Sequence, residues 1–112
     1  MKTKFNFNSQ ICTTREQSER LLALGLKKET ADMCWTKMAA IRGTFYVPEL
    51  APTNMVSWRH TPAWSLHRLL CLYGADYEIK EVYNNAEECY GMLICAIEIA
   101  IENGDFNEEY LV

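Results

Sequence analysis

Histidine and cysteine side chains gather in the stretch HTPAWSLHRLLC, residues 60–71. His67 and Cys71 are four residues apart, so a helix would place them on one face, as two metal ligands or a thiol and its base require. A structural zinc needs four ligands and a catalytic zinc needs three and a water, yet His60 precedes the expected helix and no cysteine has a matching spacing. We therefore expect flanking residues of an ordinary helix, with no metal.

A cysteine nucleophile would make further demands on the same residues. Cys71 would need His67 to be oriented by a third group, and it would need an oxyanion site nearby. The sequence identifies neither of these groups. We therefore predict that the protein is not an enzyme and that it has no catalytic residue and no cofactor.

The five cysteines point to thiols rather than disulfides. They are an odd number without CxxC spacing, and the basic first residues, MKTKFNFNSQ, lack the apolar run of an export signal. Cys89 and Cys95 are six apart on an expected helix, which turns them about 120° from each other. The apolar run at 90–101 contains Glu98 and is too short to cross a bilayer. We expect reduced thiols, a cytoplasmic location and no membrane contact.

Three helices are expected to position these side chains. The first covers 14–24, with a capping box at Thr13 and Glu16 and a left-handed stop at Gly25 followed by Leu26. The second covers 61–73, where Thr61 would cap, Pro62 would take the first helical position and Gly74 would follow the end. The third and longest covers 86–103, opened by Asn85 with Glu88 and ended by Asn103 and Gly104.

The segments between these helices indicate a small, mostly antiparallel sheet. Residues 44–47 and 54–58 would form a hairpin around the sequence PELAP, and residues 77–83 alternate as a strand does. Residues 33–35 fit either a helix or an extended segment, and we favour the extended one. Phe106, Tyr110 and Leu111 would fold back on the protein. The expected fold is α+β, three helices packed on this sheet in one domain over residues 1–112.

The two strong helices each carry a second line of side chains besides their core stripe. Leu66, Leu69, Leu70 and Tyr73 would face the core from 61–73, while Leu93 and Ile97 would do so from 86–103. The long helix is apolar on nearly every side, which favours central burial, with an interface to another molecule as the alternative. The residues expected to contact a partner form the second lines: Trp64, His67, Cys71, Met92, Cys95 and Ile99.

Charge divides the chain into two unlike halves. Residues 1–72 hold ten Lys/Arg and five Asp/Glu, whereas residues 73–112 hold one Lys and ten Asp/Glu, giving a net charge of -4. An acidic total argues against a dedicated nucleic-acid binder, and we expect the halves to complement each other in the fold. The basic half keeps a nucleic-acid-associated regulator as the alternative, through Lys27, Lys28, Lys37, Arg42, Arg59 and Arg68.

Three stretches resemble small uncharacterised proteins of phages, prophages and mobile elements of gut anaerobic bacteria. They are REQSERLLALGLKKETADMCW at 15–35, PAWSLHRLL at 62–70 and ENGDFNEEYL at 102–111, which together cover about half the chain in the same order. The resemblance implies a context inside a bacterial cell and supplies no activity or site residue. We predict a non-enzymatic accessory or protein-interaction protein of such an element, acting as a homodimer or with a bacterial or phage protein partner.

Overall fold

The computed structural model describes residues 10–74 and 86–112, which form three α-helices and one three-stranded antiparallel sheet. The helices are α1 (Arg15–Ala23), α2 (Leu66–Tyr73) and α3 (Ala86–Glu102). The strands are β1 (Met33–Ala40), β2 (Gly43–Leu50) and β3 (His60–Ala63), and β1 lies between the other two. Two 3-10 helices, η1 (Lys28–Thr30) and η2 (Glu108–Tyr110), complete the described elements. This confirms the predicted α+β class.

The predicted capping box at Thr13 and Glu16 is wrong by one residue, because Thr14 and Gln17 form the box at the start of α1. The hydroxyl of Thr14 accepts the Gln17 N–H at 3.1 Å, and Gln17 Oε1 accepts the Thr14 N–H at 2.9 Å. Thr13 is instead buried, and its hydroxyl lies 2.8 Å from that of Ser18. The predicted stop is confirmed, because Gly25 has a φ of +100° that other residues rarely adopt.

Strands β1 and β2 form a hairpin closed by the two-residue turn Ile41 and Arg42, followed by Gly43 at a φ of +135°. The extended preference for residues 33–35 is confirmed. The predicted hairpin between 44–47 and 54–58 is wrong, since β2 pairs with β1 and residues 54–58 form no strand. Pro48 fits within β2 because an edge strand needs no further N–H donor on its open side.

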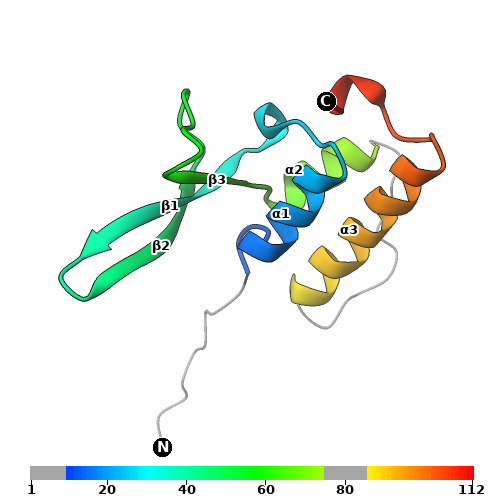
Figure 1. Cartoon of the computed structure of the whole chain (residues 1–112). Helices are drawn as coiled ribbons and strands as arrows, with labels where there is room; N and C mark the ends of the chain where they lie inside the picture. Colours follow the sequence, from blue (N-terminus) through cyan, green and yellow to red (C-terminus); the bar gives the residue numbers. More distant parts are fainter. Residues whose placement is uncertain (1–9, 75–85) are drawn as a thin grey trace, which may run out of the picture.

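The hairpin extends past the third strand. Strand β3 pairs with β1 only from Met33 to Thr36, so residues 37–46 reach beyond it, away from the helices (Figure 1). We call residues 37–46 the arm.

Helix α2 is shorter than predicted because its first residues belong to the sheet. His60–Ala63 pairs with β1, with Thr36 opposite His60 and Met33 opposite Ala63. The expected cap at Thr61 and first position at Pro62 are therefore wrong. Ser65 is the N-cap, and its hydroxyl accepts the Arg68 N–H at 3.1 Å. Strand pairing thus prevails over the Thr-Pro signal.

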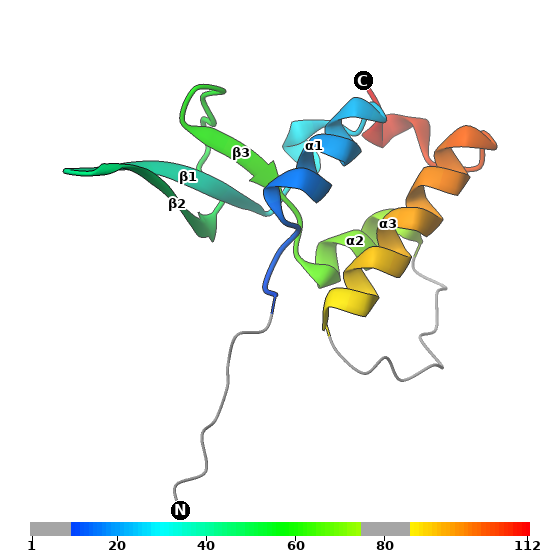
Figure 2. The same cartoon turned by 60° about the horizontal axis from the view of Figure 1, so that its bottom comes forward.

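Helices α2 and α3 pack side by side, and α1 contacts both α3 and β3 (Figure 2). Helix α3 confirms the predicted span to within one residue, whereas its predicted cap at Asn85 and the predicted strand at 77–83 lie outside the described residues. The buried cluster draws on all three helices, the segment after α1, the residue after β3 and the segment after α3; its members are Leu21, Leu26, Trp64, Leu69, Leu72, Tyr90, Leu93, Ile94, Ile97 and Phe106. No described helix is long and apolar enough to span a membrane.

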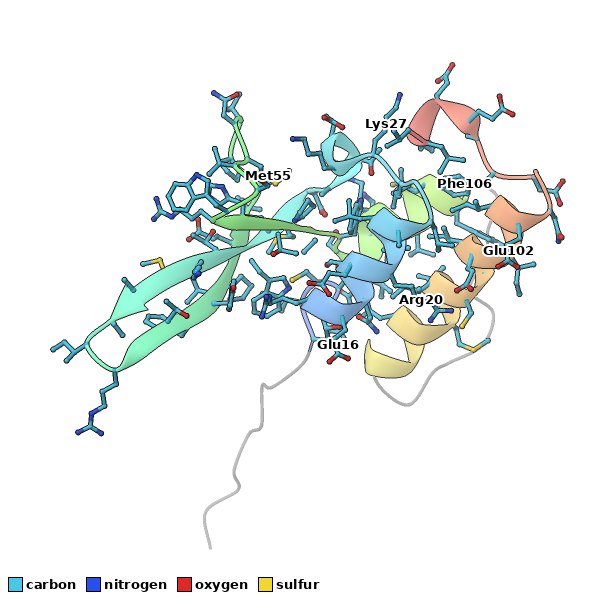
Figure 3. All side chains as sticks on the ribbon, viewed as in Figure 1. Glu16, Arg20, Lys27, Met55, Glu102 and Phe106 are labelled. Carbon is cyan, nitrogen blue, oxygen red and sulfur yellow. The ribbon has the colours of Figure 1, made fainter. Side chains whose placement is uncertain are left out.

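The last segment folds back, as predicted, and covers the end of α1. Phe106 is buried, and Leu111 forms a β-bridge with Leu26. The Lys27 N–H donates to the Tyr110 carbonyl at 2.8 Å, and the labelled Lys27 lies beside this segment in Figure 3. These contacts join the segment after α1 to the segment after α3.

Candidate interaction surfaces

Trp64 belongs to the core and not to an interaction surface, so this predicted contact residue is wrong. Its side chain is 0% exposed, and its Nε1–H donates to the Thr30 hydroxyl at 2.9 Å. Its backbone N–H donates to the Thr13 hydroxyl at 3.0 Å. The prediction placed Trp64 on a helix face, but α2 begins only at Leu66. Trp64 therefore fixes the passage from β3 to α2.

A polar network around Trp64 ties the separate motifs together. Asp32 accepts both the backbone N–H of Ser65, at 2.9 Å, and its hydroxyl, at 2.5 Å. The Trp35 Nε1–H donates to the Thr13 carbonyl at 2.8 Å. Burial, followed by the nearby Asp32 and Cys34, raises the pKa of the Cys12 thiol to about 11. These residues have structural partners, and their contacts account for their positions.

His67 and Cys71 are neighbours, as their spacing predicted. His67 Nε2 lies 3.6 Å from Cys71 Sγ, and both side chains are exposed on α2. His60 points elsewhere, because its Nδ1 accepts the Val56 N–H at 3.0 Å. Within residues 10–74 and 86–112, no group of three or more His, Cys, Asp or Glu side chains could hold a metal ion. A two-residue pair in open solvent offers too few ligands for zinc.

Helix α3 presents an apolar face to solvent. Met92 is 54% exposed, Ile99 is 57% exposed and Cys95 is exposed between them, whereas Leu93 and Ile97 are buried on the other side. The favoured central burial is therefore wrong for this face, while the expected exposure of Met92, Cys95 and Ile99 is confirmed and their contact with a partner stays a prediction. We call Met92, Cys95 and Ile99 the α3 strip.

An ion pair borders the α3 strip. Arg20 of α1 pairs with Glu98 of α3. In Figure 3 the labelled Arg20 lies beside α3. The hydrogen bond from Arg20 to Glu98 is the main cause that raises the pKa of the Arg20 guanidinium. The pair is at the surface, so it contributes little to stability. It does neutralise one of the acidic groups beside the strip.

Further large apolar side chains are exposed on the arm, at the end of β2 and in the loop after it, and the sequence patterns did not predict them. Ile41 at the tip is fully exposed, and Trp58 is 74% exposed. The complete group of exposed large apolar residues in this region is Ile41, Phe45, Leu50, Val56 and Trp58. The pairing of β1 with β2 would have predicted part of this exposure, because it places Phe45 opposite Met38 on one face of the two strands.

Basic residues accompany these exposed apolar side chains. Lys37, Arg42 and Arg59 are all exposed, and the Lys37 N–H donates to the Arg59 carbonyl at 2.8 Å. The Arg15 guanidinium lies 3.6 Å from the centroid of the Tyr46 ring and so joins the base of the arm to α1. The arm surface is therefore apolar and basic.

A cleft of 270 Å³ lies between α1, β3 and the loop that contains the labelled Met55 in Figure 3. Leu22, Met55 and Pro62 supply its apolar wall. Its charged residues, Glu19 and Lys28, have opposite signs and are both exposed. The cleft therefore selects neither an anion nor a cation by charge.

Comparison with known protein families, with curated proteins and with solved structures gives no match for this chain.

Proposed function

We propose that the protein acts by binding other protein molecules, without catalysis, as an accessory protein of a phage or mobile element in a bacterial cell. The observation that carries the proposal is the exposed apolar surface of the arm and its following loop, where Ile41 and Trp58 stand in solvent. Exposed large apolar side chains often mark a protein–protein interface, because a partner that removes them from water gains binding energy.

The composition of this region also supports a protein partner. Interfaces between proteins are enriched in aromatic residues, Met and Arg, and are depleted of Lys, Glu and Asp. Residues 37–60 contain Trp58, Phe45, Tyr46, two Met and two Arg, but only one Lys and one Glu. The resemblance of the motif stretches to small phage and prophage proteins supplies the proposed cellular context.

A nucleic-acid-associated regulator is the second candidate, and the shape of the arm favours it. A two-stranded ribbon fits a DNA major groove, and here it carries Arg42 at its tip and Lys37 at its base, where Lys37 bonds to Arg59, the neighbour of the exposed Trp58. Of the other predicted basic residues, Lys27 and Lys28 lie at the start of η1, where Lys28 lines the cleft beside the loop after β2, and Arg68 lies on α2. The net charge of -4 leaves the protein partner as the leading candidate.

Affinity capture from bacterial cells that carry the phage or mobile element encoding this protein tests the proposed function. We expect wild type to retain a defined protein, Trp58→Ser to lose it, and the control Thr53→Ala, in the same exposed loop, to retain it. The captured protein is then purified and its Kd measured for all three chains. Binding to DNA or RNA that weakens steeply with salt, with no purified protein retained, would favour the second candidate instead.

A further inference from the structure

We propose that the arm of one molecule binds the α3 strip of a second copy of the same chain, head to tail. This inference rests on the proposed protein-binding function and names one partner for it. It is carried by the chemistry of two surfaces that one chain presents at different ends. The two surfaces carry opposite charges, and each exposes apolar side chains that the other could cover.

The charges of the two surfaces are opposite. Residues 37–46 contain Lys37 and Arg42 and no Asp or Glu, and the exposed Arg59 adjoins Lys37. Residues 86–112 contain seven Asp or Glu and no Lys or Arg. Arg20 occupies Glu98, whereas the exposed acidic residues toward the end of α3 and beyond it are Glu102, Asp105, Glu108 and Glu109. These four carboxylates have no ion-pair partner among the described residues, so a basic arm could pair with them.

The apolar parts also match in kind and in length. The α3 strip runs from Met92 to Ile99, about 10 Å along the helix at 1.5 Å per residue. The free part of β1, from Lys37 to Ala40, spans about 10 Å at 3.4 Å per residue, and the arm bears the exposed Ile41 and Phe45. Docking the arm along the strip would remove both sets of apolar side chains from water and place cations beside the acidic end of α3.

The positions of the two surfaces require a separate molecule. Figures 1 and 2 both show the arm projecting from one end of the molecule and α3 at the opposite end. The arm therefore does not reach the strip of its own chain. Pairing two unlike surfaces in this way gives a ring or an open chain of copies.

Direct pairing of two α3 strips is the less favourable alternative. A parallel pair would bring Glu102 of each molecule beside Glu102 of its copy. An antiparallel pair would place Glu102 beside the first half of the copy's α3, which contains no Lys or Arg to attract it. In Figure 3 the labelled Glu102 lies at the exposed end of α3, far from the arm. The head-to-tail arrangement replaces this repulsion with attraction between the arm and that end.

Sedimentation velocity on the whole chain, over a range of protein and salt concentrations, tests the proposal. The sedimentation coefficient of wild type is expected to rise above that of a monomer as the protein concentration increases, and to return to the monomer value at high salt. Arg42→Glu and Glu102→Lys should each weaken association by at least about tenfold. An equimolar mixture of the two variants should restore it, because each altered surface then meets its complement and each unaltered surface meets the other. Glu29→Lys is the matched charge reversal outside both surfaces and should behave as wild type.

Three results would overturn the head-to-tail contact: a monomer at every concentration, association that Arg42→Glu leaves unchanged while Ile99→Glu abolishes it, or a mixture that stays as weak as its components. The altered residues are exposed, and thermal unfolding of each variant verifies that it folds. A monomeric wild type that still binds a captured protein through Trp58 would leave the proposed function intact while removing this inference.

Discussion

Asp32 and Ser65 are joined by two hydrogen bonds, one from the serine N–H and one from its hydroxyl. Ser65 is also the N-cap of α2, so this carboxylate stands at the start of that helix, where the helix dipole favours negative charge. A residue that precedes the sheet thereby determines where the helix after the sheet begins.

Replacing Asp32 should destabilise the protein. Asp32→Ala leaves both donors of Ser65 without their acceptor, so we expect a loss of about 1–3 kcal/mol in the free energy of unfolding. Asp32→Asn keeps one acceptor oxygen and should lose less. Urea unfolding measures both, with the exposed Asp105→Ala as a control that should change stability by less than about 0.5 kcal/mol. Equal effects at the two aspartates would contradict the structural role of Asp32.

The two tryptophans after the arm should respond in opposite ways to truncation. Trp64→Ala empties a buried site and should cost about 3–5 kcal/mol, whereas Trp58→Ala, at the surface, should cost less than about 0.5 kcal/mol. Urea unfolding followed by circular dichroism compares them, because it does not depend on tryptophan fluorescence. A stable Trp64→Ala protein would mean that Trp64 does not lie in the core.

The two faces of α3 give a similar contrast. Leu93→Ala and Ile97→Ala should each cost about 2–5 kcal/mol, since both side chains are buried. Met92→Ala and Ile99→Ala should leave the unfolding free energy within about 0.5 kcal/mol at concentrations where the protein is monomeric. A reversed order would show that the helix is rotated about its axis.

The cysteines should divide by reactivity toward a thiol reagent. Cys71 and Cys95 are exposed and should react first, whereas Cys12 and Cys34 are buried and should react only on unfolding. The raised pKa of Cys12, about 11, further reduces its thiolate at neutral pH. Alkylation followed by peptide mass spectrometry identifies the order. Early labelling of Cys12 in the folded protein would contradict its burial.

Stability should fall at alkaline pH. Burial raises the pKa of Tyr90 from 10.0 to about 12, although its hydroxyl accepts the Leu66 N–H, which lowers the pKa. The unfolded chain therefore releases this proton first, so the contribution of Tyr90 is complete below pH 10.0 and is lost as the pH rises toward 12. Cys12 acts in the same direction between 9.0 and about 11.

Urea unfolding at increasing pH measures this loss. Tyr90→Phe should be less stable near neutral pH, because Leu66 loses its acceptor, but its stability should decline less steeply with pH. Tyr110→Phe, at a half-buried site, is the control and should keep the steeper decline of wild type. An unchanged slope in Tyr90→Phe would assign the pH dependence to other groups.

Local signals predicted the helices best where nothing distant competed with them. Gly25 and Gly104 end α1 and α3 as expected, since both adopt a positive φ that a side chain would oppose. The α2 boundary failed because Thr61 and Pro62 also lie opposite β1, and strand pairing at long range does not show in local sequence. Because the helix was predicted to begin too early, the prediction placed Trp64 on its surface.

The sequence predicted a small antiparallel sheet, but it did not predict which strands pair. The turn at Ile41 and Arg42 contains no Asn or Asp, and its one glycine follows the turn, so the usual hairpin signal is missing. Pro48 suggested a loop but lies within an edge strand. Of the six predicted contact residues, Met92, Cys95, Ile99, His67 and Cys71 are exposed, while the arm surface could be found only with the correct strand partner.

The bridge between Leu26 and Leu111 bears on how the chain folds during synthesis. The segment around Leu26 leaves the ribosome long before Leu111 does, yet Val112 donates to the Gly25 carbonyl and Phe106 completes the buried cluster. Closing so long a loop costs entropy that local hairpin pairing of β1 with β2 avoids. The hairpin is therefore expected to form while the chain is still growing, and the three-helix core only after the last residues have emerged. A nascent chain halted before Phe106 would expose Leu26 and Ile97 to proteases and chaperones.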